Sequence, residues 1–524
     1  MAKDLTTSIY TFENLIRGNF LYVDKTEYVW QLIRPEQAMY FLSRPRRFGK
    51  SLLISTLEAI FQGKKELFQG LAINDKSYNW KTYPVIHFDF ANCDSRTPEE
   101  LQAYLEHLLK VSAEELGLEL RETGGAVRFE NLINDAAKSS TTGQVVILID
   151  EYDKPILGNI GNLPQCKAIL PVLKGFYSSI KKCAKATRFA MITGVSKFCH
   201  VSLFSDLNNL TDITLNPDYA GMLGFTSEEI RSNFADRITD AAKANDMTGE
   251  ELMRKLLEWY DGYRFSEAEL HVCNPVSVSS FFQKPYKLTN YWASTGTPSF
   301  LLELMHRQSY DFEAALNSTY DEGIFSAYEL DSLDITGLLW QTGYLTIREL
   351  VPGLRRVKYR LGFPDYEVED TFMNRLLEHF CNVPRATGEN TMETFQNAIA
   401  QNDLDLFMKL FQSFLANIPY GIHLKHEKYY QTVFFIFFRL LGLFIEAESQ
   451  TNEGRIDAYV RTEKTVFIFE FKLDKSPDSA IDQIIDRRYY EKFQSCSLPI
   501  RMVGVYFNSA KGRIDGWKEL ALPN

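Results

Sequence analysis

The sequence predicts an α/β protein, with a parallel sheet covered by helices on both faces in its N-terminal part and a second α/β domain at its C-terminal end. Three observations lead to this prediction. Short apolar runs of strand length alternate with helical stretches between residues 38 and 196. A charged and largely helical stretch follows them. Near the C-terminus, two β-prone runs joined by a short turn lie between two helical stretches.

The composition is that of an ordinary globular protein of several domains. The chain has 524 residues, which suggests three or four units of about 100 to 200 residues each. Its seven cysteines include neither a C-x-x-C pair nor a Cys/His cluster at zinc spacing, so neither a disulfide framework nor a zinc site is indicated. The net charge of −11 argues against a protein that coats nucleic acid, whose surface is usually basic, but it leaves room for an enzyme with a local basic groove.

The sequence indicates neither export nor a membrane span. Its first ten residues contain no apolar signal core. The most apolar run, 433–445, is too short to cross a bilayer and contains Arg439. We therefore expect a cytoplasmic protein without a membrane partner.

The first stretch that carries chemistry is SRPRRFGKS at residues 43–51. An apolar run of strand length precedes it, and apolar residues at helical spacing follow it. Strand, loop and helix in this order are the context of a phosphate-binding loop, or P-loop. In such a loop the backbone N–H groups wrap the phosphates, a lysine reaches the β- and γ-phosphates and a hydroxyl binds Mg²⁺. Gly49, Lys50 and Ser51 match these roles.

The loop departs from the usual pattern at its opening position, where Arg44 stands in place of glycine. The glycine permits an unusual backbone turn, which the ring of Pro45 could fix instead. Arg44, Arg46 and Arg47 either contact phosphate, act as an arginine finger or face solvent, and the sequence leaves these alternatives open. The predicted nucleotide-binding residues of the loop are Arg46, Arg47, Phe48, Gly49, Lys50, Ser51 and Leu52.

The second stretch, VVILIDEYD at 145–153, has the form of a Walker B strand. Its apolar run indicates a strand buried on both faces, and it ends in Asp150 and Glu151. In this motif Asp150 holds Mg²⁺ and Glu151 polarises the attacking water. A phosphate-binding loop followed by an acidic strand end predicts that the protein binds and hydrolyses ATP.

Two more apolar runs, 84–90 and 188–196, complete the predicted parallel sheet. The second carries Thr193 and Ser196 at its C-terminal end, the edge at which such sheets bind ligands. A hydroxyl at this edge either senses the γ-phosphate or caps a helix. We assign Ser196 to the nucleotide site.

Five linked stretches resemble the AAA-ATPase-like family, a family of bacterial P-loop proteins. The resemblance covers about residues 5–230 and implies that arginine is tolerated at the first loop position. The stretches are YVDKT (22–26), FLSRPRRFGKSLL (41–53), VVILIDEYDKPI (145–156), ITGVSKF (192–198) and SLFSDLNNLTDITL (202–215).

The middle of the chain carries no recognisable chemistry. Thr226 and Glu229 form a capping-box pattern, so residues 221–285 are expected to form a helical lid. Residues 286–395 alternate helical stretches with short strands such as 343–350, which indicates a helical or winged-helix-like connector.

The third stretch that carries chemistry is GRIDAYVRTEKTVFIFEFK, whose two β-prone runs read as a hairpin. If Glu463 and Lys464 form a two-residue turn, Asp457 lies directly opposite Glu470. Lys472 projects to the same face, because side chains alternate along a strand. Two carboxylates and a lysine suit metal-assisted hydrolysis of a phosphodiester. The alternative is a salt-bridged hairpin, in which the lysine only balances the two acids.

The elements around this hairpin follow the order helix, three strands, helix, strand. This order, with D…E-x-K on the second and third strands, resembles the PD-(D/E)XK nuclease superfamily over about residues 415–515. The resemblance implies a restriction-endonuclease-like domain that cuts DNA with Mg²⁺ or Mn²⁺. Carried over by position, Asp457, Glu470 and Glu427 are metal ligands, Lys472 and Gln483 are catalytic, and Glu448 is a further candidate carboxylate.

The sequence thus predicts an ATPase coupled to a Mg²⁺-dependent nuclease that acts on DNA or RNA. The alternative is a nucleotide-dependent switch whose C-terminal domain only binds nucleic acid or a protein partner. A homo-oligomer would fit an arginine finger that acts across a subunit interface. The expected domains are 1–220 (P-loop), 221–285 (lid), 286–395 (connector) and 396–524 (nuclease-like).

Overall fold

The computed structural model divides the chain into two compact units. The first consists of Met1–Thr295 and Thr319–Val368, and the second of Gly296–Ser318 and Glu369–Asn524. The described residues run from 3 to 522, with gaps at 122–123, 198–202, 205–206, 208, 284, 293–298, 308–309, 311, 327–332, 382–393, 396, 400, 417–443, 452–453, 463, 495, 509–510 and 512.

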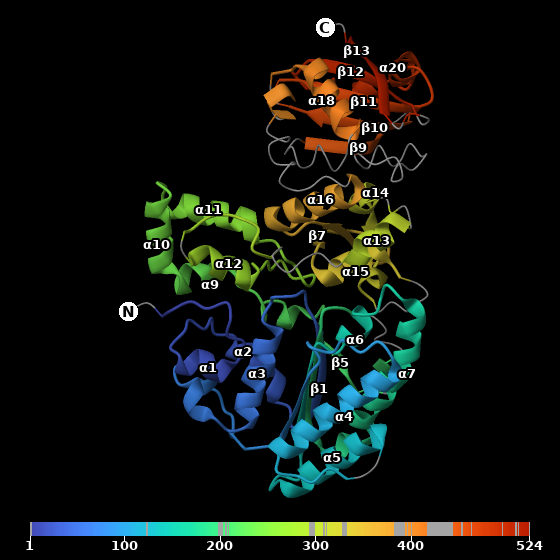
Figure 1. Cartoon of the computed structure of the whole chain (residues 1–524). Helices are drawn as coiled ribbons and strands as arrows, with labels where there is room; N and C mark the ends of the chain where they lie inside the picture. Colours follow the sequence, from blue (N-terminus) through green and yellow to red (C-terminus); the bar gives the residue numbers. More distant parts are fainter. Residues whose placement is uncertain are drawn as a thin grey trace. The chain divides into compact units, whose positions relative to one another are not determined.

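A five-stranded sheet forms the centre of the first unit (Figure 1). Its strand order is β2-β3-β4-β1-β5, and every pair of neighbours is parallel. All residues of β3 and β4 are buried, as the uninterrupted apolar runs predicted. The prediction of a parallel sheet is confirmed. The strands are β1 (Ala38–Ser43), β2 (Val85–Asp89), β3 (Val145–Asp150), β4 (Thr187–Gly194) and β5 (Thr211–Asp212).

Helices cover both faces of this sheet. In Figure 1, α1 and α3 lie on one side of the strands, while α4, α5 and α7 lie on the other and pack against one another. Phe129 and Phe176 stack between α5 and α7, with ring centroids 4.5 Å apart. The helices are α1 (Phe12–Arg17), α2 (Thr26–Ile33), α3 (Lys50–Phe61), α4 (Pro98–Glu115), α5 (Gly125–Ser139), α6 (Lys154–Leu157) and α7 (Leu163–Lys182).

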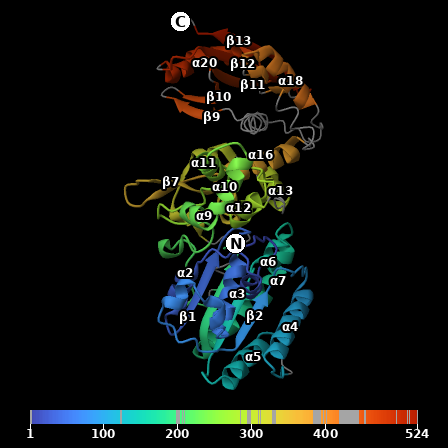
Figure 2. The same ribbon diagram turned by 90° about the vertical axis from the view of Figure 1, so that its left-hand side faces the viewer.

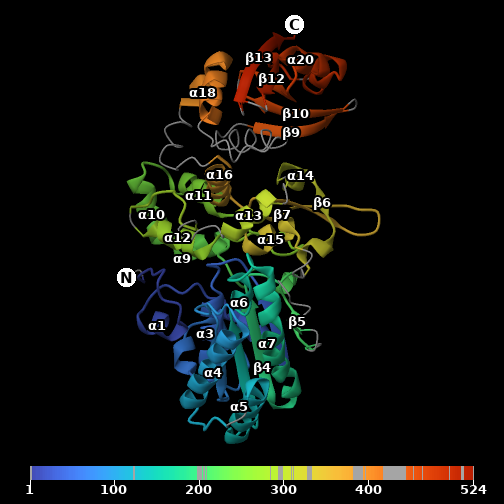
Figure 3. The ribbon, with the colours of Figure 1, turned by 45° about the vertical axis from the view of Figure 1, so that its right-hand side comes forward.

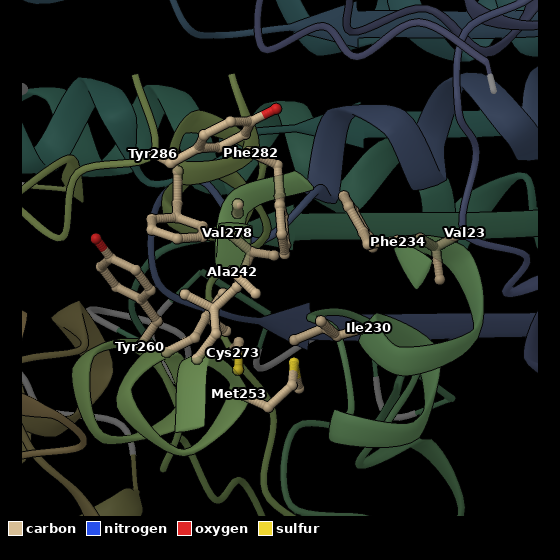
Figure 4. Close-up of a cluster of buried hydrophobic side chains, with 14 residues drawn as sticks. Val23, Ile230, Phe234, Ala242, Met253, Tyr260, Cys273, Val278, Phe282 and Tyr286 are labelled. Atoms are coloured by element: carbon tan, nitrogen blue, oxygen red, sulfur yellow. The ribbon is translucent and has the colours of Figure 1, made fainter. Parts of the chain in front are cut away.

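Four helices in the predicted lid region surround an apolar cluster of their own (Figure 4). Phe234 and Phe282 stack within it, with ring centroids 4.9 Å apart. The predicted capping box at Thr226 and Glu229 is present, and Glu229 also accepts hydrogen bonds from Lys25 at 2.6 and 2.7 Å. These helices are α9 (Ser227–Asn233), α10 (Ala235–Ala244), α11 (Gly249–Tyr260) and α12 (Pro275–Phe282).

A three-stranded sheet of order β6-β8-β7 lies in the region of the predicted connector. Helix α15 (Ile335–Thr342) lies between β6 and β7 in the chain and ends at Gly343, whose φ of 89° is left-handed. The strands are β6 (Thr319–Tyr320), β7 (Thr346–Val351) and β8 (Lys358–Gly362). Short 3₁₀ helices occupy Lys65–Phe68, Ala72–Asp75, Ala184–Ala186, Pro217–Tyr219, Glu322–Phe325 and Tyr489–Phe493.

Replacement of Gly262 by alanine is expected to destabilise the protein by about 3 kcal/mol or more. Gly262 has a φ of 131°, and a Cβ added there would lie 1.9 Å from the carbonyl oxygen of Pro364. Gly175→Ala in helix α7 is the matched control, since its Cβ would meet no atom within 4 Å. Thermal unfolding should show a lower midpoint for Gly262→Ala and an unchanged or higher one for Gly175→Ala.

The second unit contains a mixed five-stranded sheet of order β13-β12-β11-β10-β9. Strands β11 and β12 are parallel, and the other neighbours are antiparallel. Helix α20 packs against β11 and β12. The strands are β9 (Phe444–Thr451), β10 (Gly454–Arg461), β11 (Val466–Leu473), β12 (Ile500–Asn508) and β13 (Arg513–Ala521), and the helices α13 (Ser299–Arg307), α14 (Phe312–Asn317), α16 (Tyr366–Cys381, which begins in the first unit), α18 (Leu404–Ala416) and α20 (Pro477–Asp486). Among the helices in the described ranges, none is long and apolar enough to cross a membrane.

Candidate functional site

The P-loop connects β1 to α3 at the carboxyl edge of the parallel sheet. Its left-handed residues are Arg47, with a φ of 67°, and Gly49, with a φ of 94°. Arg44 is not among the described residues of positive φ, so its position requires no glycine. Pro45 packs against Gly343, where an added Cβ would lie 2.6 Å from the Cβ of Pro45. The loop thus keeps its shape without the usual first glycine.

Arg44 is buried beneath this loop. Its Nη1 atom donates to the carbonyl oxygens of Ser43 at 2.9 Å and Thr214 at 2.7 Å. Its guanidinium carbon lies 4.2 Å from the ring centre of Phe265. Burial lowers the pKa of Arg44 to about 9, although the charge of Asp212 opposes this shift. The solvent-facing alternative is wrong for Arg44, and a phosphate contact stays a prediction.

The other two loop arginines lie in different surroundings. Arg46 is exposed, and its charge acts on Lys50 and Glu151. Arg47 is half-buried and donates from Nη1 to the carbonyl oxygen of Tyr291 at 3.0 Å. Arg47 therefore links the P-loop to a segment that follows the predicted lid.

Lys50, which begins helix α3, folds back over the loop. Its Nζ atom donates to the carbonyl oxygens of Arg44 at 3.0 Å and Pro45 at 3.1 Å. Burial lowers the pKa of Lys50, while the charges of Glu151 and Asp150 act to raise it. The lysine and the acidic end of β3 therefore converge at one edge of the sheet, as expected from their motifs.

The remaining predicted residues of the loop divide into exposed and buried side chains. Ser51 is exposed, Leu52 is half-buried and Phe48 is buried. The ring of Phe48 lies 4.7 Å from that of Tyr263 and 5.3 Å from that of Phe265. Its side chain belongs to the core, so the predicted contact of Phe48 with a nucleotide rests on its backbone N–H.

Asp150 and Glu151 are positioned by strand β4 and by their own backbone. The Oδ1 atom of Asp150 accepts hydrogen bonds from the hydroxyl of Thr193 and, at 3.1 Å, from the N–H of Glu151. Glu151 is left-handed, with a φ of 53°, which is strained for a side chain of this kind. Burial raises the pKa of Glu151, and Lys50 opposes this shift. A carboxylate of raised pKa suits a general base.

Asp153 is a buried residue of this site that was not predicted from the sequence. Its Oδ2 atom accepts hydrogen bonds from the N–H and the hydroxyl of Ser196, both at 2.7 Å, and the N–H of Val195 also donates to the carboxylate at 3.2 Å. Burial raises the pKa of Asp153, although these hydrogen bonds oppose the shift. The Ser196 hydroxyl thus contacts Asp153, and its predicted contact with a nucleotide stays a prediction. The only signal in the sequence was a third acid in IDEYD.

A buried carboxylate stands near Arg47. Glu367 is 1% exposed and accepts hydrogen bonds from the hydroxyl of Ser277 at 2.6 Å and from the N–H of Trp292. Burial raises the pKa of Glu367 to about 7, while these hydrogen bonds and the charge of Arg47 oppose the shift. In turn, the charge of Glu367 helps burial to raise the pKa of the neighbouring Asp365.

Glu367→Gln is expected to make stability less sensitive to pH. A folded-state pKa near 7, above the unfolded value of 4.5, means that the wild type loses stability as pH rises from about 4.5 to 7. Glutamine carries no charge to bury, so its free energy of unfolding should not fall as pH rises. The variant should have about the same free energy of unfolding as the wild type at pH 5 and one about 2–3 kcal/mol higher at pH 8. Denaturant unfolding at the two pH values measures the difference. Glu258→Gln, at an exposed position, should show no such pH dependence.

In the second unit, the predicted hairpin register is confirmed. Strands β10 and β11 pair Ala458 with Phe469 and continue to Arg461 opposite Val466. The next step of this register in the other direction brings Asp457 opposite Glu470. The strands predicted at 455–461 and 466–472 are Gly454–Arg461 and Val466–Leu473, each one residue longer, and residue 463 of the predicted turn lies outside the described residues.

Glu470, which is buried, and Lys472, which is half-buried, form an ion pair on one face of β11. The Nζ atom of Lys472 lies 2.6 Å from Oε1 of Glu470, whose side chain is 0% exposed. Phe469 and Phe471, at the alternate positions, are buried as predicted. Glu470 and Lys472 lie on the same face of β11, as expected. Their contact also fits the alternative of a salt-bridged hairpin.

Helix α20 covers the face that carries Glu470. On the neighbouring strand β12, Gly504 pairs with Glu470, and a Cβ added at Gly504 would lie 2.3 Å from the carbonyl oxygen of Pro477 in α20. Residues paired on neighbouring strands share a face, so the helix lies over the carboxylate side. Gln483 belongs to this helix, and its Nε2 atom contacts the hydroxyl of Tyr489 at 3.5 Å.

The other predicted metal ligands are only partly described. Glu427 lies outside the described residues, and the side chains of Glu448 and Asp457 do as well. The register of β9 and β10 brings Glu448 beside Asp457, next to Glu470 in the same row across the sheet. Among the described side chains, no group of three or more His, Cys, Asp or Glu could hold a metal ion. A buried carboxylate in this row suits a hard cation, but the complete ligand set stays a prediction.

Two stretches of the chain match known families. Residues 6–204, which contain the P-loop and the acidic end of β3, match the AAA-ATPase-like family model, described as "Predicted AAA-ATPase". Residues 425–517, which contain the β10–β11 hairpin, match the PD-(D/E)XK nuclease superfamily. A relative from Azotobacter chroococcum mcd 1, "Uncharacterized protein in vnfD 5'region", is 34% identical over a match 524 residues long. The match covers 98% of this chain and 98% of the relative.

Proposed function

The chain belongs to the AAA-ATPase-like family in its N-terminal part and carries a C-terminal domain of the PD-(D/E)XK nuclease superfamily, and from this we propose that it is an ATPase coupled to a Mg²⁺-dependent DNA nuclease. ATP binds at the P-loop, and its binding or hydrolysis controls cleavage. The observation that carries the proposal is the convergence of Lys50 with Asp150 and Glu151, which come from distant parts of the sequence.

The ATPase part of the proposal assigns a step to each group at the sheet edge. The backbone N–H groups at the start of α3 and Lys50 hold the phosphates. Ser51 and Asp150 would hold Mg²⁺, which would neutralise charge on the phosphates. Glu151, whose pKa is raised by burial, orients the attacking water and takes its proton. Asp153 keeps the end of β4 beside these groups through its hydrogen bonds to Ser196.

The nuclease part of the proposal rests on the row of carboxylates in the second sheet. Asp457 and Glu470 would hold the cation, and Glu427 would be a third ligand. Mg²⁺ or Mn²⁺ would supply an activated water and bind the scissile phosphate. Lys472 then transfers its contact from Glu470 to the phosphate, where it stabilises the charge that develops. Gln483 positions the nucleic acid or the water from helix α20.

Helix α16 offers a connection between the two activities along the chain. Glu367, in its first turn, feels the charge of Arg47 from the P-loop, and the residues from Glu369 onward belong to the second unit. A phosphate that attracts Arg47 would change the electrostatic surroundings of the start of this helix. Control of cleavage by the nucleotide is proposed to use this connection.

One observation favours a second candidate, a nucleotide-dependent switch without nuclease activity. The Nζ atom of Lys472 lies 2.6 Å from Oε1 of Glu470, so a cation must compete with the lysine for the carboxylate. In this second proposal the C-terminal domain binds nucleic acid or a protein partner and does not cut.

A cleavage assay distinguishes the two proposals. Linear, nicked and single-stranded DNA and an RNA strand are incubated with the full chain and Mg²⁺ or Mn²⁺, with and without ATP. We expect metal-dependent cleavage of DNA, a change in its rate on addition of ATP, and loss of cleavage in Asp457→Ala. Cleavage that persists in Asp457→Ala contradicts the site assignment, and the absence of cleavage on every substrate favours the switch.

A further inference from the structure

The hairpin of β7 and β8 ends in an exposed tip, residues 352–357, of sequence PGLRRV. Figures 2 and 3 show this hairpin reaching outward beyond the neighbouring helices, and Figure 3 shows α15 near its base. Leu354 at the tip is fully exposed, and Val357 is 38% exposed. A fully exposed leucine contributes nothing to the core, and at the end of a projecting hairpin it is accessible to a partner.

The tip and the outward face of the hairpin are strongly basic. The two strands and the tip together contain five basic residues and one acidic residue, in a chain whose net charge is −11. Arg355, Arg356 and Lys358 are exposed, and within the described part of the chain none of them forms an ion pair. Arg360 is about half exposed and pairs with Glu349 at 2.7 Å. A hairpin that is merely solvated usually mixes charges of both signs, and this tip carries only positive ones.

The base of the hairpin is held firmly within the first unit. The N–H of Arg264 donates to the hydroxyl of Thr346 at 2.7 Å, and this hydroxyl lies 3.1 Å from the carbonyl oxygen of Arg264. Gly343, just before β7, packs against Pro45 of the P-loop. The hairpin therefore presents its charged tip from a rigid base that also contacts the nucleotide loop.

We propose that the β7–β8 hairpin is a DNA-binding element that enters a groove of a duplex. Arg355 and Arg356 contact phosphates on the two sides of the groove, Lys358 extends this contact along the outward face, and Leu354 lies against the base edges. The inference goes beyond the proposed function, because this binding requires neither nucleotide nor cleavage.

The shape of the hairpin favours duplex DNA over other anionic partners. The major groove of DNA is about 12 Å wide and admits a two-stranded ribbon, whereas the major groove of duplex RNA is deep and narrow. In the major groove, apolar side chains contact the methyl groups of thymine bases. The acidic charge of the chain as a whole repels DNA, so the affinity must come from local basic groups such as these.

Binding of a fluorescent DNA duplex to the full chain, in EDTA and without nucleotide, tests this inference. We expect the Arg355→Glu, Arg356→Glu double variant to raise the Kd at least tenfold at about 100 mM salt. We also expect it to reduce the slope of log Kd against log salt by about 2, since each phosphate contact contributes about 0.9. The control is Arg254→Glu with Lys255→Glu, an exposed basic pair on α11 that undergoes the same change in charge. It should alter the Kd less than about threefold.

A second variant separates the leucine from the charges. Leu354→Asp is expected to raise the Kd severalfold with a smaller change in salt slope than the double arginine variant. Duplex RNA of the same sequence should bind at least tenfold more weakly than duplex DNA. All variants should keep the wild-type unfolding midpoint, because the altered side chains are exposed.

Three results would overturn the inference. One is a wild-type chain that binds no DNA duplex, and another is a double arginine variant with the Kd and salt slope of the control. The third concerns vesicles of phosphatidylserine. If the wild type binds them and the double arginine variant does not, while both bind DNA equally, the hairpin is a membrane-surface element. A wild-type chain that binds the duplex but does not cleave DNA would count against the proposed function alone.

Discussion

Lys50→Met is expected to reduce ATP hydrolysis at least about 100-fold, the size of effect seen when one donor that stabilises transition-state charge is removed. The Nζ atom of Lys50 now rests on two carbonyl oxygens of its own loop and lies in the field of Glu151. Methionine retains most of the side-chain volume, so the buried site stays filled. Release of inorganic phosphate under saturating ATP, together with the Kd for ATP, measures the effect.

The matched control for this variant is Lys65→Met. Lys65 is exposed in the 3₁₀ helix that follows α3, and its replacement should leave hydrolysis within about twofold of the wild type. If Lys50→Met hydrolysed ATP at the wild-type rate while remaining folded, the proposed P-loop chemistry would be wrong. The nuclease proposal would survive that result.

Glu470→Gln is expected to reduce metal-dependent cleavage of DNA at least about 1000-fold. The change keeps the shape of the side chain but removes the charge that is proposed to bind the cation. Thermal unfolding provides the check on folding, and Glu519→Gln, at a partly exposed position on β13, provides a control for loss of one carboxylate. Cleavage by Glu470→Gln at the wild-type rate would contradict the metal site.

The same residues distinguish a working site from a salt-bridged hairpin. Lys472→Ala should destabilise the protein by about 3 kcal/mol, because the fully buried Glu470 loses the lysine that lies 2.6 Å from it. The double variant Glu470→Gln, Lys472→Ala should recover most of the lost stability, since no buried charge remains. A structural ion pair predicts this pattern of stability without any cleavage by the wild type. A nuclease predicts the same pattern together with cleavage that both single changes abolish.

Much of the fold followed from local patterns in the sequence. Apolar runs identified the buried strands β3 and β4, because a strand covered on both faces needs no polar side. The period of two in the C-terminal hairpin determined its register, since a slip by one residue would turn every side chain to the opposite face. Family membership followed from motifs whose residues lie close together in the chain.

The surroundings of individual side chains did not follow from such patterns. Arg44 was expected at a phosphate or in solvent, yet it is buried under Phe265 and bonded to Thr214, 170 residues away. Arg47 contacts Tyr291, 244 residues away. Contacts between residues so far apart in the sequence depend on how the helices and strands pack. Local periodicity in the sequence does not encode this packing.

The sequence by itself determined the order of the elements, the two motif sets and the register of the hairpin, because each depends on spacing over a few residues. Only the tertiary structure decided which charges are buried and what they contact. Asp153 binds the end of β4, Glu367 reaches a pKa near 7, and the basic tip at Leu354 stays exposed. Burial sets these properties, and burial is a property of the packed chain.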